Sequence, residues 1–217
     1  MKKIFSNIKY YFRKILSTKN TSEINEKYWI IGIGGFGSRA VEFLQKQSPN
    51  TLMYAIDTKE VDLSMIKLKN KIIIGKDLLK GLGSEYKPNN AKKAVQISAE
   101  NIKTILKQNS NKKLYIITGF GRGTGTGATP EIVKLANQYE VVPEILAISY
   151  MGWGDNKDNR GLVKECFIEL EKILCNIYFY DDDFLRKKIG ELKFKKAFVE
   201  ICDMLKKRLD EIETNSI

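Results

Sequence analysis

A glycine-rich stretch between a strand-like run and a helical pattern constrains this chain more than any other feature. Residues 119–130 read GFGRGTGTGATP and follow directly after the β-branched run Leu114–Thr118. Successive glycine amides can form a concave anion site, and the threonine hydroxyls add donors for phosphate oxygens. A flexible linker rarely joins a strand directly to a helix, and the sequence contains no G-x-x-x-x-G-K-[ST] pattern. We therefore interpret the stretch as a phosphate-binding loop outside the P-loop class.

A second glycine-rich segment follows the first strand-like run. Residues 32–37 read GIGGFG and match the pattern G-x-G-x-x-G, while Asp57 closes the next run where a dinucleotide fold places its ribose-binding acid. Alone, this pattern fits NAD, FAD and several phosphate sites. Two such loops at one cleft indicate a diphosphate or triphosphate held from both sides. A nicotinamide-dependent oxidoreductase built on residues 32–37 would leave the glycine-rich stretch at 119–130 unexplained.

Strand-like and helix-like segments alternate from Tyr28 onward. The strand-like runs are continuously apolar, which is typical of parallel strands buried on both faces. They cover Tyr28–Ile33, Leu52–Ile56, Lys71–Ile74, Leu114–Thr118, Ile145–Ser149 and Asn176–Tyr180. Helical periodicity covers Ser38–Gln47, Asn89–Leu106, Pro130–Tyr139 and Leu162–Leu174. The pattern predicts an α/β fold with a doubly wound, mostly parallel sheet and helices on both faces, whose ligands bind at the carboxyl ends of the strands.

The two ends of the chain differ from this α/β region. Residues 181–213 predict one long helix with a narrow apolar stripe, and the acids at 181–183 predict its N-cap. Residues 1–18 predict a basic amphipathic helix, followed by a polar linker at 19–27. Its apolar face consists of Ile4, Phe5, Ile8, Tyr11, Phe12, Ile15 and Leu16.

More than half of the net charge of +11 lies in the first twenty residues, where six Lys and Arg precede the first acid, Glu23. A basic helix with an apolar aromatic face suits an anionic membrane surface. Docking of the helix on the protein itself or on a partner protein is the alternative. The charge of the remaining chain is too diluted to favour nucleic acid, so no nucleic-acid partner is expected.

Composition excludes several kinds of chemistry. The sequence has no histidine, which removes Ser-His-Asp triads and the common zinc sites. The three cysteines form no C-x-x-C pair and suit a reducing compartment. No run of apolar residues is long enough to span a membrane. We therefore expect a cytoplasmic protein that is peripheral at the inner face of the cell membrane.

The sequence GTGTG at residues 123–127 resembles the glycine loop of the tubulin/FtsZ family. The similarity runs from about Tyr28 to Leu209 and includes Ile31–Val41, Ala55–Leu63 and Gly81–Gly83. The resemblance implies a nucleotide-binding domain over residues 28–180 and a central helix over 181–213. It also implies GTP or GDP as the ligand, with a magnesium ion accompanying GTP and no metal site made by the protein alone.

The resemblance also implies which residues hold the nucleotide. In this resemblance, Gly34, Gly35 and Phe36 lie beside the phosphates, and residues 121–127 wrap the β and γ phosphates. Phe198 stacks on guanine. Arg39 and Arg122 add cations at positions where the family has other residues, and Cys202 stands where the family reads the guanine edge. The full set is Gly34, Gly35, Phe36, Arg39, Gly121, Arg122, Gly123, Thr124, Gly125, Thr126, Gly127, Asp155, Arg160, Asp181, Phe198 and Cys202.

In this family the catalytic acids lie on a loop after the central helix and act on the nucleotide of the neighbouring subunit. The sequence ends soon after Glu213, so we expect no catalytic residue and no second domain in this chain. We expect a membrane-attached GTP-binding protein that caps or modulates filaments of a full-length FtsZ-type partner, or contacts itself head to tail. Hydrolysis would then need acids from the partner. The alternatives are a self-assembling minimal polymer in cell division or plasmid partition, and a nucleotide-free interaction module.

Overall fold

The computed structural model describes residues 27–149, 157–190 and 192–215. The predicted amphipathic helix at 1–18, with all seven of its apolar residues, lies outside the described residues. No helix in the described part of the chain is both long enough and apolar enough to cross a membrane.

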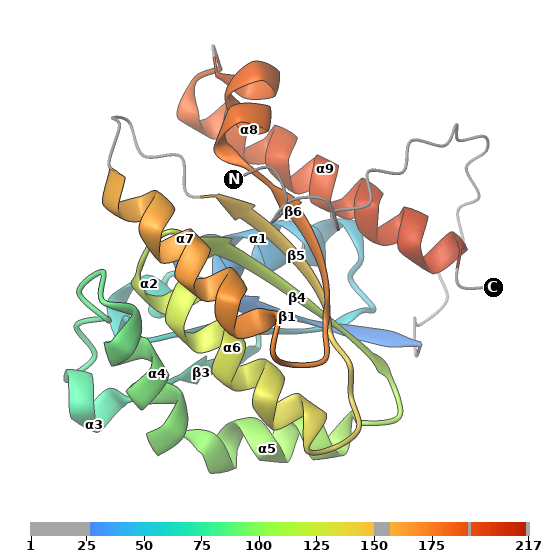
Figure 1. Cartoon of the computed structure of the whole chain (residues 1–217). Helices are drawn as coiled ribbons and strands as arrows, with labels where there is room; N and C mark the ends of the chain where they lie inside the picture. The colour runs from blue at the N-terminus through green and yellow to red at the C-terminus, as the bar shows by residue number, and fades with distance from the viewer. Residues whose placement is uncertain (1–26, 150–156, 191, 216–217) are drawn as a thin grey trace.

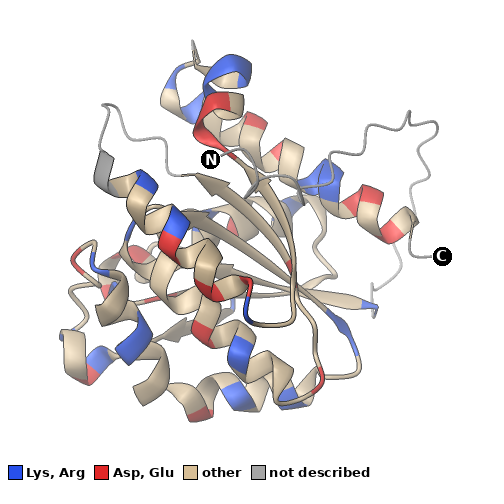
Figure 2. Cartoon of the chain, in the orientation of Figure 1, with Lys and Arg blue, Asp and Glu red and all other residues tan. Residues whose placement is uncertain are grey.

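The described strands form one parallel sheet of six, in the order β3-β2-β1-β4-β5-β6. This arrangement confirms the predicted fold class, and the strand ends differ only slightly from those predicted. The strands are almost free of charge along their length, as burial on both faces requires (Figure 2). Their bounds are β1 (Tyr28–Ile33), β2 (Leu52–Asp57), β3 (Asn70–Ile73), β4 (Lys113–Phe120), β5 (Glu144–Ser149) and β6 (Asn176–Tyr180).

Helices cover both faces of the sheet (Figure 1). The helices α4, α5, α6 and α7 pack on one face, and α1, α2, α8 and α9 pack on the other. The short α3 lies between β3 and α4. The bounds are α1 (Gly34–Gln47), α2 (Glu60–Ser64), α3 (Lys76–Leu79), α4 (Pro88–Ile97), α5 (Ala99–Gln108), α6 (Gly123–Asn137), α7 (Lys157–Leu170), α8 (Asp182–Ile189) and α9 (Phe194–Thr214).

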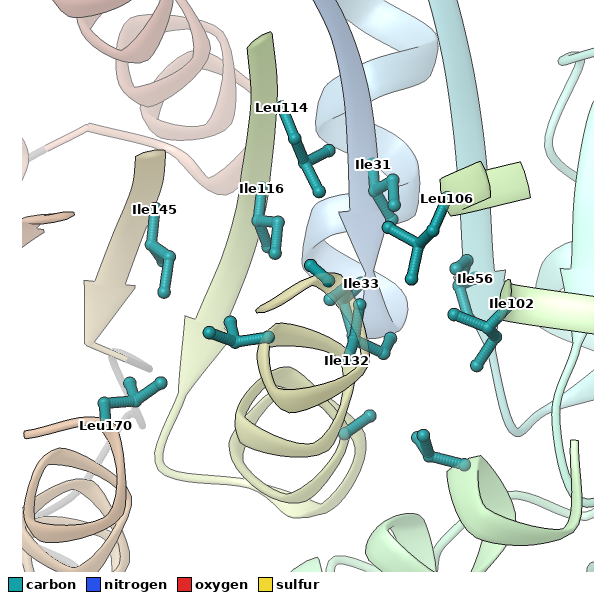
Figure 3. Close-up of a cluster of buried hydrophobic side chains, with 14 of the residues drawn as sticks. Ile31, Ile33, Ile56, Ile102, Leu106, Leu114, Ile116, Ile132, Ile145 and Leu170 are labelled. Atoms are coloured by element: carbon teal, nitrogen blue, oxygen red, sulfur yellow. The ribbon is translucent and has the colours of Figure 1, made fainter. Parts of the chain in front are cut away.

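Each face of the sheet has its own core, because side chains alternate along every strand. In β1, Trp29, Ile31 and Ile33 face α4–α7, whereas Tyr28 and Ile30 face the other layer. Figure 3 shows the first of these cores, where isoleucines of four neighbouring strands meet apolar side chains of α5, α6 and α7. The labelled contributors are Ile31, Ile33, Ile56, Leu114, Ile116 and Ile145 from the strands, and Ile102, Leu106, Ile132 and Leu170 from the helices.

Two helices predicted as continuous are broken in the structure. The segment Asn89–Leu106 contains α4 and α5, which meet at Ser98, whose hydroxyl accepts a hydrogen bond from the Gly75 amide at 2.8 Å. The segment 181–213 contains α8 and α9 rather than one long helix. The chain leaves the first helix at Gly190, a poor helix former, and Lys193 is extended before α9 begins.

The predicted N-cap at the start of this region is confirmed. The Asp181 carboxylate accepts a hydrogen bond from the Phe184 amide at 2.7 Å, so it caps α8.

Candidate functional site

A cleft of about 960 Å³ opens at the carboxyl ends of β1 and β4. These two strands are neighbours, but the chain runs outward from β1 toward β2 and β3 on one side and from β4 toward β5 and β6 on the other. The strand order therefore reverses between them. Open α/β sheets bind their ligands at such a reversal.

Two helices begin at the floor of this cleft. α1 starts at Gly34, directly after β1, and α6 starts at Gly123, three residues after the end of β4. Neither helix start is capped by a side chain of the described residues. Free amides and the positive end of the helix dipole at both starts favour an anion between them.

The two glycine segments approach each other closely. Gly34 has φ +74°, which L side chains rarely adopt, and a Cβ built on it would lie 3.0 Å from the Gly125 amide nitrogen. A side chain at this position would fill the gap between the two helix starts. The glycine therefore keeps both sets of amides accessible from the cleft.

The prediction of a long loop at 119–130 is wrong in its extent. Only Gly121 and Arg122 separate β4 from α6, and Gly123–Thr129 form the first turns of that helix. A helix there is compatible with glycine because α6 packs tightly against α4: a Cβ on Gly127 would lie 2.0 Å from the Pro88 carbonyl oxygen. The anion site is thus a helix start and not an open concave loop.

One end of the cleft carries hydroxyl groups, and we call it the hydroxyl end (Thr58, Ser84 and Thr124). The Thr124 Oγ1 lies 2.7 Å from the Thr58 Oγ1 and 3.2 Å from the Ser84 Oγ. Below them, the Asp57 carboxylate accepts a hydrogen bond from the Thr58 amide at 2.7 Å. Asp57 is 3% exposed, and this burial raises the pKa of its carboxyl. Three hydroxyls around one point can donate to phosphate oxygens.

The opposite end is lined by rings, and we call it the aromatic end (Phe36, Phe194 and Phe198). The rings of Phe36 and Phe198 lie edge to face with centroids 6.1 Å apart. Phe194, one helical turn before Phe198, is 70% exposed at the rim. These rings offer an apolar surface to the flat base of a nucleotide.

Cations outnumber carboxylates among the described residues of the cleft. Three carboxylates line it, and all are engaged: Asp57 with the Thr58 amide, Asp62 with Lys59 at 3.3 Å, and Glu85 with Lys87 at 3.0 Å. An excess of positive charge in a concave site attracts polyphosphates. The cations that line it are Arg39, Lys59, Arg122, Arg186 and Lys195.

Most of the predicted phosphate-binding residues come together in this cleft. Those that line it are Gly34, Gly35, Phe36, Arg39, Arg122, Gly123, Thr124 and Gly125, together with Phe198 at the aromatic end. Asp155 lies outside the described residues.

Six of the predicted residues are absent from the lining described by the structure. The Thr126 hydroxyl accepts from the Gly121 amide at 2.9 Å, so both residues stabilise the turn, and Gly127 faces α4. Asp181 caps α8, and Arg160 is exposed on α7. Cys202 is fully buried in the core under α9, where burial raises the pKa of its thiol to about 12.

Sequence reasoning missed several residues of the cleft. Thr58 and Ser84 contribute hydroxyls, Tyr86 contributes a ring, and Arg186 and Lys195 contribute charge. The position of Thr58 could have been inferred, since it follows β2, and β2 is the neighbour of β1. Ser84 and Tyr86 reach the cleft through an irregular segment before α4, which carries no comparable periodic signal.

The described residues contain no group of three or more His, Cys, Asp or Glu that could hold a metal ion. The buried Asp57 and the hydroxyl end provide only a few hard oxygen donors. Magnesium usually retains several waters and takes one or two carboxylates plus substrate phosphates. The residues therefore fit a magnesium ion carried by the nucleotide rather than one held by the protein alone.

Comparison with known proteins assigns the family. Residues 27–161 match the tubulin/FtsZ family, GTPase domain. The cell division protein FtsZ of Buchnera aphidicola subsp. Baizongia pistaciae (strain Bp) is 37% identical over 179 residues, which are 82% of this chain and 46% of the relative. FtsZ of Aquifex aeolicus (strain VF5) is 32% identical and covers 83% of this chain and 49% of the relative. The chain belongs to the tubulin/FtsZ family and contains its GTPase domain.

Solved structures share the same fold. An FtsZ dimer from M. jannaschii superimposes with a TM-score of 0.74 at 24% identity, covering 82% of this chain and 52% of that one. A GTPγS-bound protofilament of CetZ2 from Haloferax volcanii gives a TM-score of 0.73 at 18% identity, covering 86% and 57%. The chain spans about half the length of the relatives that it matches.

Proposed function

We propose that this chain binds GTP and GDP in the cleft, with the phosphates at the starts of α1 and α6 and the base at the aromatic end. The meeting of two helix starts, uncapped by any described side chain, at the reversal of the sheet order carries this proposal. Membership of a GTPase-domain family over residues 27–161 supports guanine as the base. The CetZ2 relative was solved with GTPγS, which supports the same ligand class.

Each part of the cleft has a distinct task in this proposal. The amides at Gly34 and Gly123 donate to phosphate oxygens, and the hydroxyl end adds further donors. The lining cations offset the charge of the polyphosphate. A bound magnesium ion would supply additional charge neutralisation at the phosphates. Phe198 provides the surface on which the base lies.

A competition assay on the full chain tests nucleotide binding. A fluorescent GTP analogue is bound first and then displaced by GTP, GDP, ATP or NAD. We expect GTP and GDP to displace it at much lower concentrations than ATP or NAD. If no nucleotide binds, the chain is a nucleotide-free interaction module. If NAD competes best, the glycine segment at 32–37 serves a dinucleotide.

Hydrolysis is proposed to depend on an acid from a second protein. The three carboxylates that line the described part of the cleft are a buried, backbone-bonded Asp57 and the ion-paired Asp62 and Glu85. Each already holds a backbone amide or a lysine, so in this proposal none of the three serves as the base that activates a water molecule. We expect slow phosphate release by the chain alone and faster release with an FtsZ-type partner. Turnover by the chain alone at the rate of an assembled FtsZ would contradict this dependence.

The cellular role that we propose is the one that the sequence predicts: capping or modulation of FtsZ-type filaments at an anionic membrane surface. The relatives solved as a dimer and as a protofilament support a contact of this chain with an FtsZ-type partner or with a second copy of itself. Filament length measured by electron microscopy should shorten when this chain is added to an FtsZ-type partner with GTP. Pelleting of the chain with GTP alone would instead identify a self-assembling polymer.

The membrane part of this role is tested separately with vesicles that contain phosphatidylglycerol. We expect the full chain to sediment with them and a Phe5→Asp, Phe12→Asp double variant to remain in solution. Equal sedimentation of both proteins, or of neither, would contradict attachment through residues 1–18.

A further inference from the structure

Arg122 occupies a special position between β4 and α6. Its backbone is extended, it immediately precedes the first residue of α6, and its side chain lines the cleft. The guanidinium carbon lies 4.8 Å from the centroid of the Tyr86 ring. A cation over an aromatic face at this distance is an attractive but weak contact at an exposed site. Arg122 and Tyr86 are both exposed.

The segment that carries Tyr86 is itself held in an unfavourable conformation. Glu85 and Tyr86 have φ values of 52° and 60°, which L residues rarely adopt. The segment contacts the start of α6 at two points: through Ser84, whose Oγ lies 3.2 Å from the Thr124 Oγ1, and through the ring of Tyr86 under Arg122. Both contacted groups, the Thr124 hydroxyl and the Arg122 guanidinium, are groups that a phosphate can also bind.

The two ends of the cleft determine where a bound nucleotide would place its last phosphate. A base on Phe198 directs the phosphate chain away from α9, past the starts of α1 and α6, and toward the hydroxyl end. Arg122 adjoins the hydroxyl end in two ways. Its guanidinium contacts Tyr86, which follows Ser84 by two residues, and Arg122 itself precedes Thr124 by two residues. A triphosphate extends one phosphate further in this direction than a diphosphate does.

We propose that Arg122 is the residue that makes this chain prefer guanosine triphosphate over diphosphate, by leaving the Tyr86 ring to bind the terminal phosphate. The inference rests on the proposed function and specifies one determinant of it. Arginine presents several N–H donors in one plane and can bind a phosphate through two of them. Such a charge-assisted contact is stronger than the contact with the ring that it replaces. The Tyr86 ring thus holds the guanidinium beside the site without blocking it.

Calorimetric titration of the full chain with GTPγS and with GDP, both with magnesium, tests the proposal. We expect Arg122→Ala to lower GTPγS affinity about 10- to 100-fold, as loss of a hydrogen bond to a charged group predicts, and to change GDP affinity less than about 2-fold, within the scatter of a surface substitution. Arg122→Lys keeps the charge but not the paired donors, so it should restore only part of the difference. Tyr86→Phe keeps the ring under the guanidinium, so its ratio of GTPγS affinity to GDP affinity should stay closer to the wild-type ratio than that of Arg122→Ala.

Arg186→Ala is the matched control, since it removes one cleft cation near the other end and should affect both nucleotides alike. Thermal unfolding of each variant checks that the exposed substitutions leave the fold intact. If the wild type binds neither nucleotide, the proposed function fails. A second result separates the two proposals. If the wild type binds GTPγS and GDP, the proposed function stands. The role of Arg122 is then overturned if Arg122→Ala lowers both affinities equally, lowers neither, or raises the affinity for GTPγS.

Discussion

The phosphate side of the cleft and its aromatic end are built in different ways. At the phosphate side, backbone amides at Gly34 and Gly123 face a gap that side chains would close. At the aromatic end, the surface comes from side chains of α1 and α9, which meet because α9 packs against α1 and the sheet. The first kind of site is encoded locally by residue type, whereas the second depends on how distant elements meet. The following predictions test this difference, beginning with the largest expected effect.

Closing the gap between the two helix starts should abolish nucleotide binding. A Cβ on Gly34 would lie 3.0 Å from the Gly125 amide nitrogen, and its φ of +74° costs an L residue about 1–2 kcal/mol. We therefore expect Gly34→Ala to eliminate detectable GTP binding and to lower the melting temperature modestly. The measurements are calorimetric titration and thermal unfolding.

Gly161→Ala is the control for this variant. Gly161 lies in α7, and a Cβ there would meet nothing within 4 Å, so alanine should stabilise the helix by about 0.5–1 kcal/mol. GTP affinity should be unchanged. Normal GTP binding by Gly34→Ala would show that the two helix starts are not the phosphate site.

Removing the central ring of the aromatic end should weaken binding without abolishing it. Phe198→Ala deletes the proposed stacking surface, and stacking of a base on an aromatic side chain contributes about 1–3 kcal/mol. GTP and GDP affinities should fall by the same factor, because both share the base. Phe194→Ala, which removes the exposed ring at the rim, should have a smaller effect. Unequal loss of GTP and GDP in Phe198→Ala would place the base elsewhere.

Neutralising the buried carboxylate at the hydroxyl end should improve both stability and binding. Burial raises the pKa of Asp57, so its stabilising contribution is present at low pH and is lost as pH rises through the folded-state pKa. Asp57→Asn keeps an oxygen for the Thr58 amide and removes the buried charge. We expect a higher melting temperature at pH 7, a smaller increase toward pH 3, and several-fold tighter GTP binding. An increase in melting temperature that grows as pH falls would contradict this account.

Cys202 should matter for stability and not for the nucleotide. It is fully buried below α9, so Cys202→Ser places a hydroxyl in the core at a cost of about 1–3 kcal/mol. Burial raises the pKa of its thiol to about 12, so the folded protein keeps the proton up to higher pH than the unfolded chain does. This contribution is complete at neutral pH and decreases only as pH rises above the ordinary thiol range. A change in the preference for GTP over ATP in Cys202→Ser would contradict this placement.

The sequence was sufficient for the parts of the fold with strong local signals. Continuous apolar runs located β1 and β6 to the residue. The starts of α1 and α6 were predicted four and seven residues too late, because their first turns consist largely of glycine, a poor helix former. The break at Gly190 was missed because the apolar stripe continues through α8 and α9 at compatible spacing. Cys202 was misplaced as a ligand because the facing of α9 is set by tertiary packing.

The hydroxyl end shows a similar limit. Thr124 was predicted from the glycine stretch itself, but its partners Thr58 and Ser84 come from two other segments. Thr126 and Gly127 belong to the same stretch, yet helical geometry directs them toward the turn at Gly121 and toward α4. Residue type therefore predicted the kind of site, and the phase of the helix decided which residues line it.

We propose above all that the amides at the starts of α1 and α6 hold the phosphates of a guanine nucleotide. Hydrogen–deuterium exchange of the full chain with and without GTPγS tests it most directly. We expect strong protection of peptides that contain Gly34–Phe36 and Arg122–Thr126, weaker protection around Phe198, and no change in α5. Protection confined to other segments, or none at saturating GTPγS, would contradict it.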